Sequence, residues 1–320
     1  MKYGKEGDFV VNRKGKVLAV CTSAQKGTQK QPVDAITLKP DWGIEGDAHA
    51  GHWHRQVSLL AYEKIEEFRK RGADVAFGAF GENIVCEGFD LRTLPVGTRF
   101  QIGDCLLELS QIGKACHSHC EIYKLVGDCI MPREGVFTIV LKGGVVKPGD
   151  EITLIEADPE RPFTAAVITL SDRASRGEYE DKSGPLIREM LEAAGYQVLE
   201  QLVLPDGRPR LELELTRLAD QRQISVIFTT GGTGFSLRDL TPEATKAVCD
   251  REVPGIGEAL RADSLKYTPN AILSRQTAGI RKQSLIINLP GSPKACRENL
   301  EFLLKSLAHG LGILRGTATD

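Results

Sequence analysis

The sequence predicts a multidomain chain: a mainly β, barrel-like domain, then a three-layer α/β domain with a mostly parallel, doubly wound sheet. The chain has 320 residues, about twice a common domain size, so two domains are expected. The segment 156–163 carries two prolines and four charged residues between two apolar runs, which is typical of a linker. The strand and helix patterns also differ on its two sides. We therefore expect domains at residues 1–157 and 163–320.

The first half is predicted to be mainly β because its apolar stretches are short and punctuated by glycines. These stretches lie at residues 16–21, 57–60, 106–109 and 137–141. Only residues 62–71 have a helical pattern, with Ile65 and Phe68 three positions apart among charged side chains. The pattern predicts a β barrel or sandwich with one or two helices.

In the second half, strand and helix signals alternate. Strands are expected at 165–170, 197–203 and 225–230, and helices at 184–194 and 210–221. Leu211, Leu215 and Leu218 recur at i, i+4 and i+7, which gives the second helix one apolar stripe to pack on a sheet. This alternation predicts helices packed on a sheet of parallel strands.

Composition and charge exclude several classes of function. Charged residues make up 26% of the chain, hydrophobic residues 41%, and the formal net charge is −2. This balance differs from that of a disordered chain and from that of a basic nucleic-acid binder. No apolar run approaches the length of a membrane span, and the N-terminus lacks the apolar core of a secretory signal. We expect a cytoplasmic protein that binds small molecules or proteins, and neither nucleic acid nor a membrane.

Four short motifs follow predicted strands of the second half, where open parallel sheets bind their ligands. They lie at residues 171–173, 205–207, 231–234 and 290–293. The glycine-rich segment 229–234 offers backbone N–H groups that no Cβ obstructs, which suits a phosphate or pterin oxygen. On its own, a glycine-rich turn is a weak signal.

The segment after this turn begins a helix. Thr241 can cap that helix, Pro242 suits its first position, and Glu243 suits the positive end of its dipole. Asp239 is not needed for the cap, so a chemical role is the more interesting interpretation of this carboxylate.

Eight motifs of the second half occur in the order found in MogA/MoaB-type molybdopterin adenylyltransferases, a family that this half therefore resembles. The motifs lie at residues 171–175, 204–206, 229–234, 238–245, 254–258, 271–276, 281–282 and 288–293. The resemblance implies that the terminal phosphate of molybdopterin attacks the α-phosphorus of ATP and releases pyrophosphate. Such chemistry uses Mg²⁺ and positioned charge, and is independent of pyridoxal phosphate.

The resemblance also implies the site residues. Asp206 and Asp239 match the two family aspartates assigned to catalysis, where they would hold Mg²⁺ through the phosphates. Binding of pterin or nucleotide falls to a larger set: Ser171, Asp172, Thr230, Gly231, Gly232, Thr233, Gly234, Arg275, Pro290, Gly291 and Ser292, with Arg281 and Lys282 as further candidates. The alternatives are a plain turn at Asp206, a surface loop charge at Asp239, and solvated basic side chains.

The first half is similar to MOSC domains over about residues 14–156. The motifs that carry this likeness lie at residues 43–51, 55–58, 80–84, 94–97 and 109–116. The resemblance implies a sulfur carrier or cofactor binder, with Cys116 as the cysteine that could bear a persulfide. Lys114 would help to lower the pKa of this thiol. The family's Arg-x-Pro-Cys-like lead is replaced here by Lys114-Ala-Cys116, which keeps a positive charge near the thiol.

Two alternatives for Cys116 remain open. It can be a small buried hydrophobe, or part of a zinc or molybdenum site. The candidate ligands of such a site are His117, His119 and Cys120 beside it, and His49, His52 and His54 in an earlier loop.

Two alternatives to the adenylyltransferase are a non-catalytic protein that binds molybdopterin or molybdate, and a nucleotide hydrolase of the related CinA class. Asp206 and Asp239 argue against the first, and the motifs at 238–242 and 289–293 argue against the second. Because relatives form trimers or hexamers, we expect a homotrimer. A molybdenum-insertion protein is a candidate partner.

Overall fold

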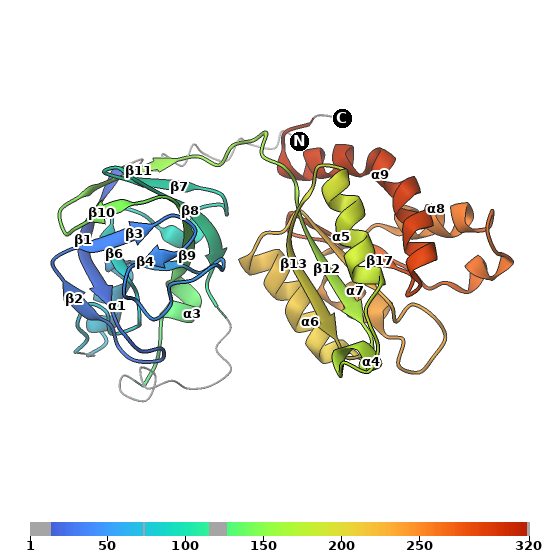
Figure 1. The fold of residues 1–320 in the computed structure, drawn as a ribbon, viewed down its shortest axis with the longest axis horizontal. Helices are drawn as coiled ribbons and strands as arrows, with labels where there is room; N and C mark the ends of the chain where they lie inside the picture. The colour runs from blue at the N-terminus through green and yellow to red at the C-terminus, as the bar shows by residue number, and fades with distance from the viewer. Residues whose placement is uncertain (1–13, 73, 115–126, 319–320) are drawn as a thin grey trace, which may run out of the picture. The chain divides into compact units, whose positions relative to one another are not determined.

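A computed structural model describes residues 14–72, 74–114 and 127–318. The chain divides into two compact units, Met1–Asp158 and Pro159–Asp320 (Figure 1). No helix in the described ranges is long and apolar enough to cross a membrane.

The first unit is built around a closed seven-stranded barrel, which confirms the mainly β prediction. Its strands follow the order β1 (Lys14–Thr22), β11 (Glu151–Ile155), β7 (Arg99–Ile102), β8 (Cys105–Ile112), β9 (Val136–Lys142), β5 (Val57–Ala61) and β6 (Ile84–Glu87), and β6 pairs with β1. β2 (Gln31–Val33) extends β1 at one end. A three-stranded sheet contains β3 (Ile36–Lys39), β4 (Gly43–Ile44) and β10 (Gly144–Val146).

Alternating burial along the strands explains the barrel. In β7 the side chains of Phe100 and Ile102 are buried, whereas those of Arg99 and Gln101 are partly exposed. The helix α1 (Tyr62–Arg69) buries Ile65 and Phe68, the two positions predicted from sequence. The short helices η1 (Leu91–Thr93) and α3 (Met131–Glu134) complete the described part of this unit.

The second unit contains a six-stranded, mostly parallel sheet. Its order is β13 (Gln197–Leu204), β12 (Thr164–Leu170), β14 (Val226–Thr230), β17 (Ser284–Leu289), β16 (Ala278–Arg281) and β15 (Arg251–Glu252). The first four strands pair in parallel, and β16 and β15 add an antiparallel edge that the sequence did not predict. Because β13 and β14 lie on opposite sides of β12, the winding direction reverses there.

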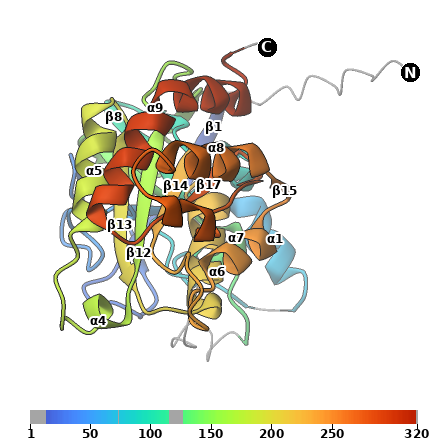
Figure 2. The same cartoon turned by 90° about the vertical axis from the view of Figure 1, so that its right-hand side faces the viewer.

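Alternate side chains of β12 enter two separate apolar clusters. Ala165 and Val167 join one cluster with α5 (Ser183–Ala193), α8 (Pro254–Ser264) and α9 (Pro293–Arg315). Ala166 and Ile168 join another with α6 (Arg208–Thr216), the π-helical turn η2 (Arg217–Gln221) and α7 (Thr241–Val248). Figures 1 and 2 show α5 and α9 side by side. Helices thus cover the sheet. The apolar stripe of Leu211, Leu215 and Leu218 is buried, as predicted.

Candidate functional site

The carboxyl ends of four strands meet at one edge of the second sheet. Leu170 of β12 pairs with Leu204 of β13, and Thr230 of β14 pairs with Leu289 of β17. The four motifs predicted at strand ends follow these residues directly. The fold therefore brings together segments that lie more than a hundred residues apart in the chain.

Asp172 and Asp206 tie two of these segments together. The backbone N–H of Asp172 donates to Asp206 Oδ2, and the backbone N–H of Asp206 donates to Asp172 Oδ1, both at 3.1 Å. Arg238 Nη2 donates to Asp172 Oδ1 at 2.9 Å and to the carbonyl of Asp206 at 3.1 Å. Asp172 is therefore occupied by backbone and guanidinium donors, and its main effect is to fix the position of Asp206.

Asp206 and Asp239 each keep one carboxylate oxygen for a ligand. Asp239 Oδ2 accepts the N–H of Ser236 at 3.0 Å, while Oδ1 of Asp239 and Oδ1 of Asp206 make no hydrogen bond within the described ranges. No group of three or more His, Cys, Asp or Glu side chains that could hold a metal occurs among the described residues. The two oxygens nevertheless fit Mg²⁺, which commonly uses one or two carboxylates together with substrate phosphates and water.

Two glycines of the glycine-rich turn are required by backbone geometry. Gly231 has φ +97° and Gly232 has φ +64°, in the region that favours glycine. A Cβ at Gly231 would lie 2.5 Å from the carbonyl oxygen of Leu170, and one at Gly232 would lie 2.3 Å from Thr241 Oγ1. The turn can thus pass close to β12 and α7 only without side chains.

Thr241 is not the cap of α7, so that prediction is wrong. It is the first residue of the helix, which starts without a side-chain cap. Its Oγ1 instead donates to the carbonyl of Gly231 at 3.0 Å, because the glycine turn folds back over the helix start. The Thr241 hydroxyl, which the sequence predicted to cap the helix, therefore stabilises the glycine turn.

Arg275 holds the loop that follows the glycine turn. Its Nε donates to the carbonyl of Gly234 at 2.7 Å, and its backbone N–H donates to the carbonyl of Thr233 at 3.0 Å. The two terminal nitrogens bond the Glu243 carboxylate and the carbonyl of Asp239. These contacts orient the loop that carries Asp239, and ligand binding by Arg275 stays a prediction.

Arg281 and Lys282 lie near the amino end of β17, whereas the strand-end site lies at its carboxyl end. This position corrects their prediction as ligand-binding groups. Arg281 pairs with Ser284 at the amino end of β17, because β16 runs antiparallel to that strand. Arg281 Nη2 lies 2.5 Å and Lys282 Nζ 3.2 Å from the Asp220 carboxylate. Both cations are thus paired away from the strand-end site.

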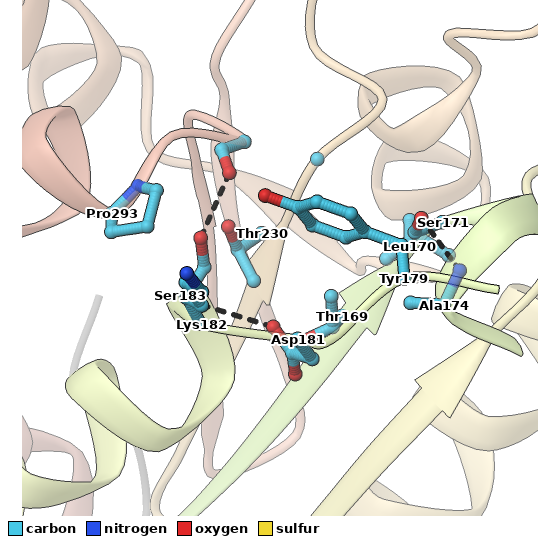
Figure 3. Close-up of a pocket in the computed structure, with 12 residues that line it drawn as sticks. Thr169, Leu170, Ser171, Ala174, Tyr179, Asp181, Lys182, Ser183, Thr230 and Pro293 are labelled. Atoms are coloured by element: carbon cyan, nitrogen blue, oxygen red, sulfur yellow. Dashed lines mark hydrogen bonds between the residues drawn. The ribbon is translucent and has the colours of Figure 1, made fainter. Parts of the chain in front are cut away.

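Beside the glycine turn is a pocket of about 460 Å³, open solvent included (Figure 3). It contains four predicted residues, Ser171, Thr230, Gly231 and Gly291. Sequence reasoning missed several others, among them Tyr179, Asp181 and Lys182 from the connection between α4 (Asp172–Ser175) and α5, and Ser183 at the start of α5.

Asp181 is a sequence signal that could have identified this connection as part of the pocket. Its Oδ1 accepts the N–H groups of Ser183 and Gly184, both at 3.0 Å, and its Oδ2 accepts Thr169 Oγ1 at 2.7 Å. An aspartate just before a predicted helix is a common start signal. This carboxylate binds the strand end to the helix start and so shapes the pocket.

The segment 290–292 closes the other side of the pocket. The carbonyl of Pro290 accepts Thr230 Oγ1 at 2.6 Å, and the carbonyl of Gly291 accepts Ser183 Oγ at 2.8 Å. Ser292 caps α9 by accepting the N–H of Ala295 at 3.3 Å. These contacts fix the turn and leave its Gly291 backbone facing the pocket.

The first unit has a second pocket of about 710 Å³, open solvent included, with a basic lining. It is lined by Lys26, His49, Trp53, Arg55, Ser58, Gly81, Asn83, Lys114, Met131 and Phe137. The Arg55 guanidinium carbon lies 4.8 Å from the Trp53 ring centroid and 5.7 Å from that of Phe137. This lining suits an anionic group next to an apolar body.

A buried ion pair lies beneath this basic pocket. Lys30 is 2% exposed and pairs with Asp47, which also accepts the backbone N–H of His49 at 2.9 Å and Asn83 Nδ2 at 3.1 Å. Burial alone would raise the pKa of the Asp47 carboxyl, but the hydrogen bonds from His49 and Lys30 hold it well below its usual range. His49 Nδ1 lies 3.4 Å from Lys30 Nζ.

The three loop histidines do not converge on a metal. His52 Nδ1 contacts the Asp41 carboxylate at 2.9 Å, His54 Nε2 contacts Gln111 Oε1 at 2.8 Å, and His49 faces Asp47. Their partners differ because the loop turns between them. Cys116, His117, His119 and Cys120 lie outside the described residues, as do the contacts expected of them.

Comparisons with known proteins divide along the same two units. The family described as "Probable molybdopterin binding domain" matches residues 166–309, and the family "MOSC domain" matches residues 46–153. A Helicobacter pylori strain J99 protein named molybdopterin adenylyltransferase is 49% identical over 152 residues, covering 47% of this chain and 86% of that relative. A protein of the same name from Escherichia coli K12 is 49% identical over 137 residues, covering 42% and 70%.

Among solved structures, MoaB from Thermus thermophilus, titled a molybdopterin biosynthesis enzyme, is 44% identical. The match covers 48% of this chain and 97% of that one, with a TM-score of 0.46.

Proposed function

The chain belongs to the molybdopterin adenylyltransferase family through its second unit, and we propose that this unit transfers AMP from ATP to the terminal phosphate of molybdopterin. A phosphate oxygen of the pterin forms a bond to the α-phosphorus of ATP. The bond between that phosphorus and the bridging oxygen to the β-phosphate breaks, and pyrophosphate leaves with the electron pair.

The observation that carries this proposal is the placement of two partly unoccupied carboxylates near one another at the strand-end site: Arg238, from the loop that carries Asp239, donates to the carbonyl of Asp206. Asp206 is fixed by Asp172, and Asp239 by the loop that Arg275 holds. Mg²⁺ bound there would neutralise charge on the phosphates. The protein's own residues contribute position: phosphoryl transfer needs aligned reactants and charge stabilisation more than covalent help.

The direct test is incubation of the purified chain with molybdopterin and Mg-ATP, following adenylylated pterin and pyrophosphate. Asp206→Asn and Asp239→Asn keep an oxygen that can accept the N–H of Asp172 or Ser236, so the loops can persist. Each variant is expected to lose roughly 100-fold or more in kcat, the scale seen when a charge-stabilising group is removed from an active site.

Glu189→Gln is the matched control, because Glu189 is an exposed carboxylate on α5 that does not line the pocket. It should retain wild-type turnover. If the wild-type chain binds molybdopterin but forms no pyrophosphate, the second unit is a binding protein without catalysis. Wild-type activity in Asp206→Asn and Asp239→Asn would contradict the role proposed for the two aspartates.

For the first unit, we propose that its MOSC domain carries sulfur on Cys116 or binds the cofactor. The basic pocket of this unit supports an anionic ligand, and it includes Lys114, which precedes Cys116 by two positions in the sequence. An intact-mass adduct of about 32 Da, one sulfur atom, that disappears in Cys116→Ala would support the carrier role. Its absence after incubation with a sulfur donor would leave cofactor binding.

We also propose a cytoplasmic homotrimer that passes its product to a molybdenum-insertion protein, as the family resemblance implies. Light scattering of the full chain tests the assembly, and a monomer across the working concentration range would contradict it.

A further inference from the structure

Tyr179 is an aromatic side chain at the strand-end pocket to which the reaction outlined above gives no role. It is 52% exposed and forms part of the pocket wall. Figure 3 shows its ring reaching across the pocket from the side of Ala174 toward Thr230. A large ring left half in water forgoes part of the free energy of burial, which a ligand stacked on it would restore.

One contact of the ring favours its orientation before any ligand binds. The guanidinium carbon of Arg173 lies 5.4 Å from its centroid, within the range of a cation–π contact. The N–H of Glu178 donates to the carbonyl of Arg173 at 2.9 Å, and the Glu178 carboxylate pairs with Arg176 at 2.6 Å. These contacts tie the segment before Tyr179 to α4, so stacking on the ring requires little additional ordering.

Another part of the pocket wall is bare backbone. A Cβ placed on Gly291 would lie 3.5 Å from Gly231 Cα, so the two glycines are neighbours. Because neither residue carries a side chain, no group projects from this part of the wall. A space bounded by an aromatic ring and by glycine backbone suits a flat ligand better than a branched one.

The charges around the pocket favour a ligand that also carries phosphate. The Asp181 carboxylate is taken up by Thr169 Oγ1 and by the N–H groups of Ser183 and Gly184. Lys182 lines the pocket, and its ammonium group makes no ion pair or hydrogen bond within the described part of the chain. The cation is thus available to an anionic ligand, while the oxygens of the Asp181 carboxylate already accept three hydrogen bonds.

We propose that Tyr179 is the stacking residue of this pocket and that its ligand is a planar nitrogen heterocycle attached to phosphate. The inference rests on the proposed adenylyltransferase, whose two substrates both have this chemistry: a pterin in molybdopterin and an adenine in ATP. Tyr179 contacts the ring of one substrate and sets its affinity, while Asp206 and Asp239 act on the phosphates.

The experiment compares Tyr179→Ala and Tyr179→Phe with wild type in the full chain. Titration calorimetry gives Kd separately for molybdopterin and for Mg-ATP, and steady-state assays give KM for each together with kcat. Loss of one stacked ring is expected to raise Kd and KM of one substrate roughly 10-fold, with kcat changed less than about twofold. Tyr179→Phe should match wild type, because stacking needs the ring and not the hydroxyl.

Tyr267→Ala is the matched control, since Tyr267 is 51% exposed and does not line the pocket. A rise confined to the molybdopterin arm identifies the pterin as the stacked ring, and a rise confined to the ATP arm identifies adenine. Unchanged affinity for both substrates in Tyr179→Ala overturns the proposal, as does an equal loss for both. Binding without turnover in wild type would refute the proposed reaction alone, because the Kd values still test the stacking.

Discussion

The two units place their carboxylates in opposite settings. In the first unit, Asp47 and its partner Lys30 have side chains only 1% exposed. In the second unit, Asp206 follows the end of β13, Asp239 lies in the loop before α7, and each keeps an oxygen for a ligand. A charge buried in a core has lost its water and must be fully hydrogen-bonded, whereas a charge at a loop can still exchange one partner for another. The buried charge therefore serves structure, and the partly buried one is suited to chemistry.

The sharpest way to break this comparison is to remove one partner of the buried pair. Lys30→Met leaves the Asp47 carboxylate buried without its cation, and we expect a loss of about 3–5 kcal/mol in the free energy of unfolding of the first unit. Urea unfolding followed by tryptophan fluorescence measures this directly, because both tryptophans, Trp42 and Trp53, belong to that unit.

Lys39→Met is its control, since the ion pair with Glu45 has side chains 51% and 57% exposed. That change should cost less than about 1 kcal/mol. Similar losses in the two variants would show that burial does not distinguish these pairs.

A second prediction concerns the pH dependence of the first unit. Burial raises the pKa of Glu82 to about 7 from 4.5, although the N–H groups of Gly78 and Phe80 donate to it. Between these two values the folded state binds more protons than the unfolded state, so stability falls as pH rises. The loss is complete above pH 7 and amounts to at most about 3 kcal/mol.

Glu82→Gln carries no charge, so subtracting its unfolding free energy from that of wild type isolates this effect. The difference should decline between pH 4.5 and 7 and then level off. A difference that stays constant with pH would contradict the assignment.

In the second unit, the comparison is sharpened by backbone geometry. Gly232→Ala puts a Cβ 2.3 Å from Thr241 Oγ1 at a residue with φ +64°, and should destabilise this unit by about 1–3 kcal/mol. Gly310→Ala, within α9 and with nothing within 4 Å, should instead stabilise it by up to about 1 kcal/mol. Thermal unfolding followed by the circular dichroism of the helices reports both, and the same sign in both variants would contradict the turn geometry.

The sequence predicted a mainly β first unit, either barrel or sandwich, and the parallel strands and strand-end motifs of the second unit, because these depend on local periodicity and on turn residues. It misplaced Arg281 and Lys282 because the direction of β16 depends on its pairing with β17 and leaves no local signal. It also missed Lys30 as a core residue, since lysine is almost always exposed unless it is paired. Tyr179 escaped notice because its position at the pocket depends on how a whole connection folds.

Closure of the barrel also sets an order of events during synthesis. Lys14 of β1 pairs with Thr153 of β11, so the first strand of the unit finds this neighbour only after almost the entire unit has left the ribosome. Such distant pairing carries a loop-closure cost that must be met before the contact contributes, and it makes folding slow. Until that moment β1 lacks this partner, and an unpaired strand edge is a site at which a nascent chain can aggregate.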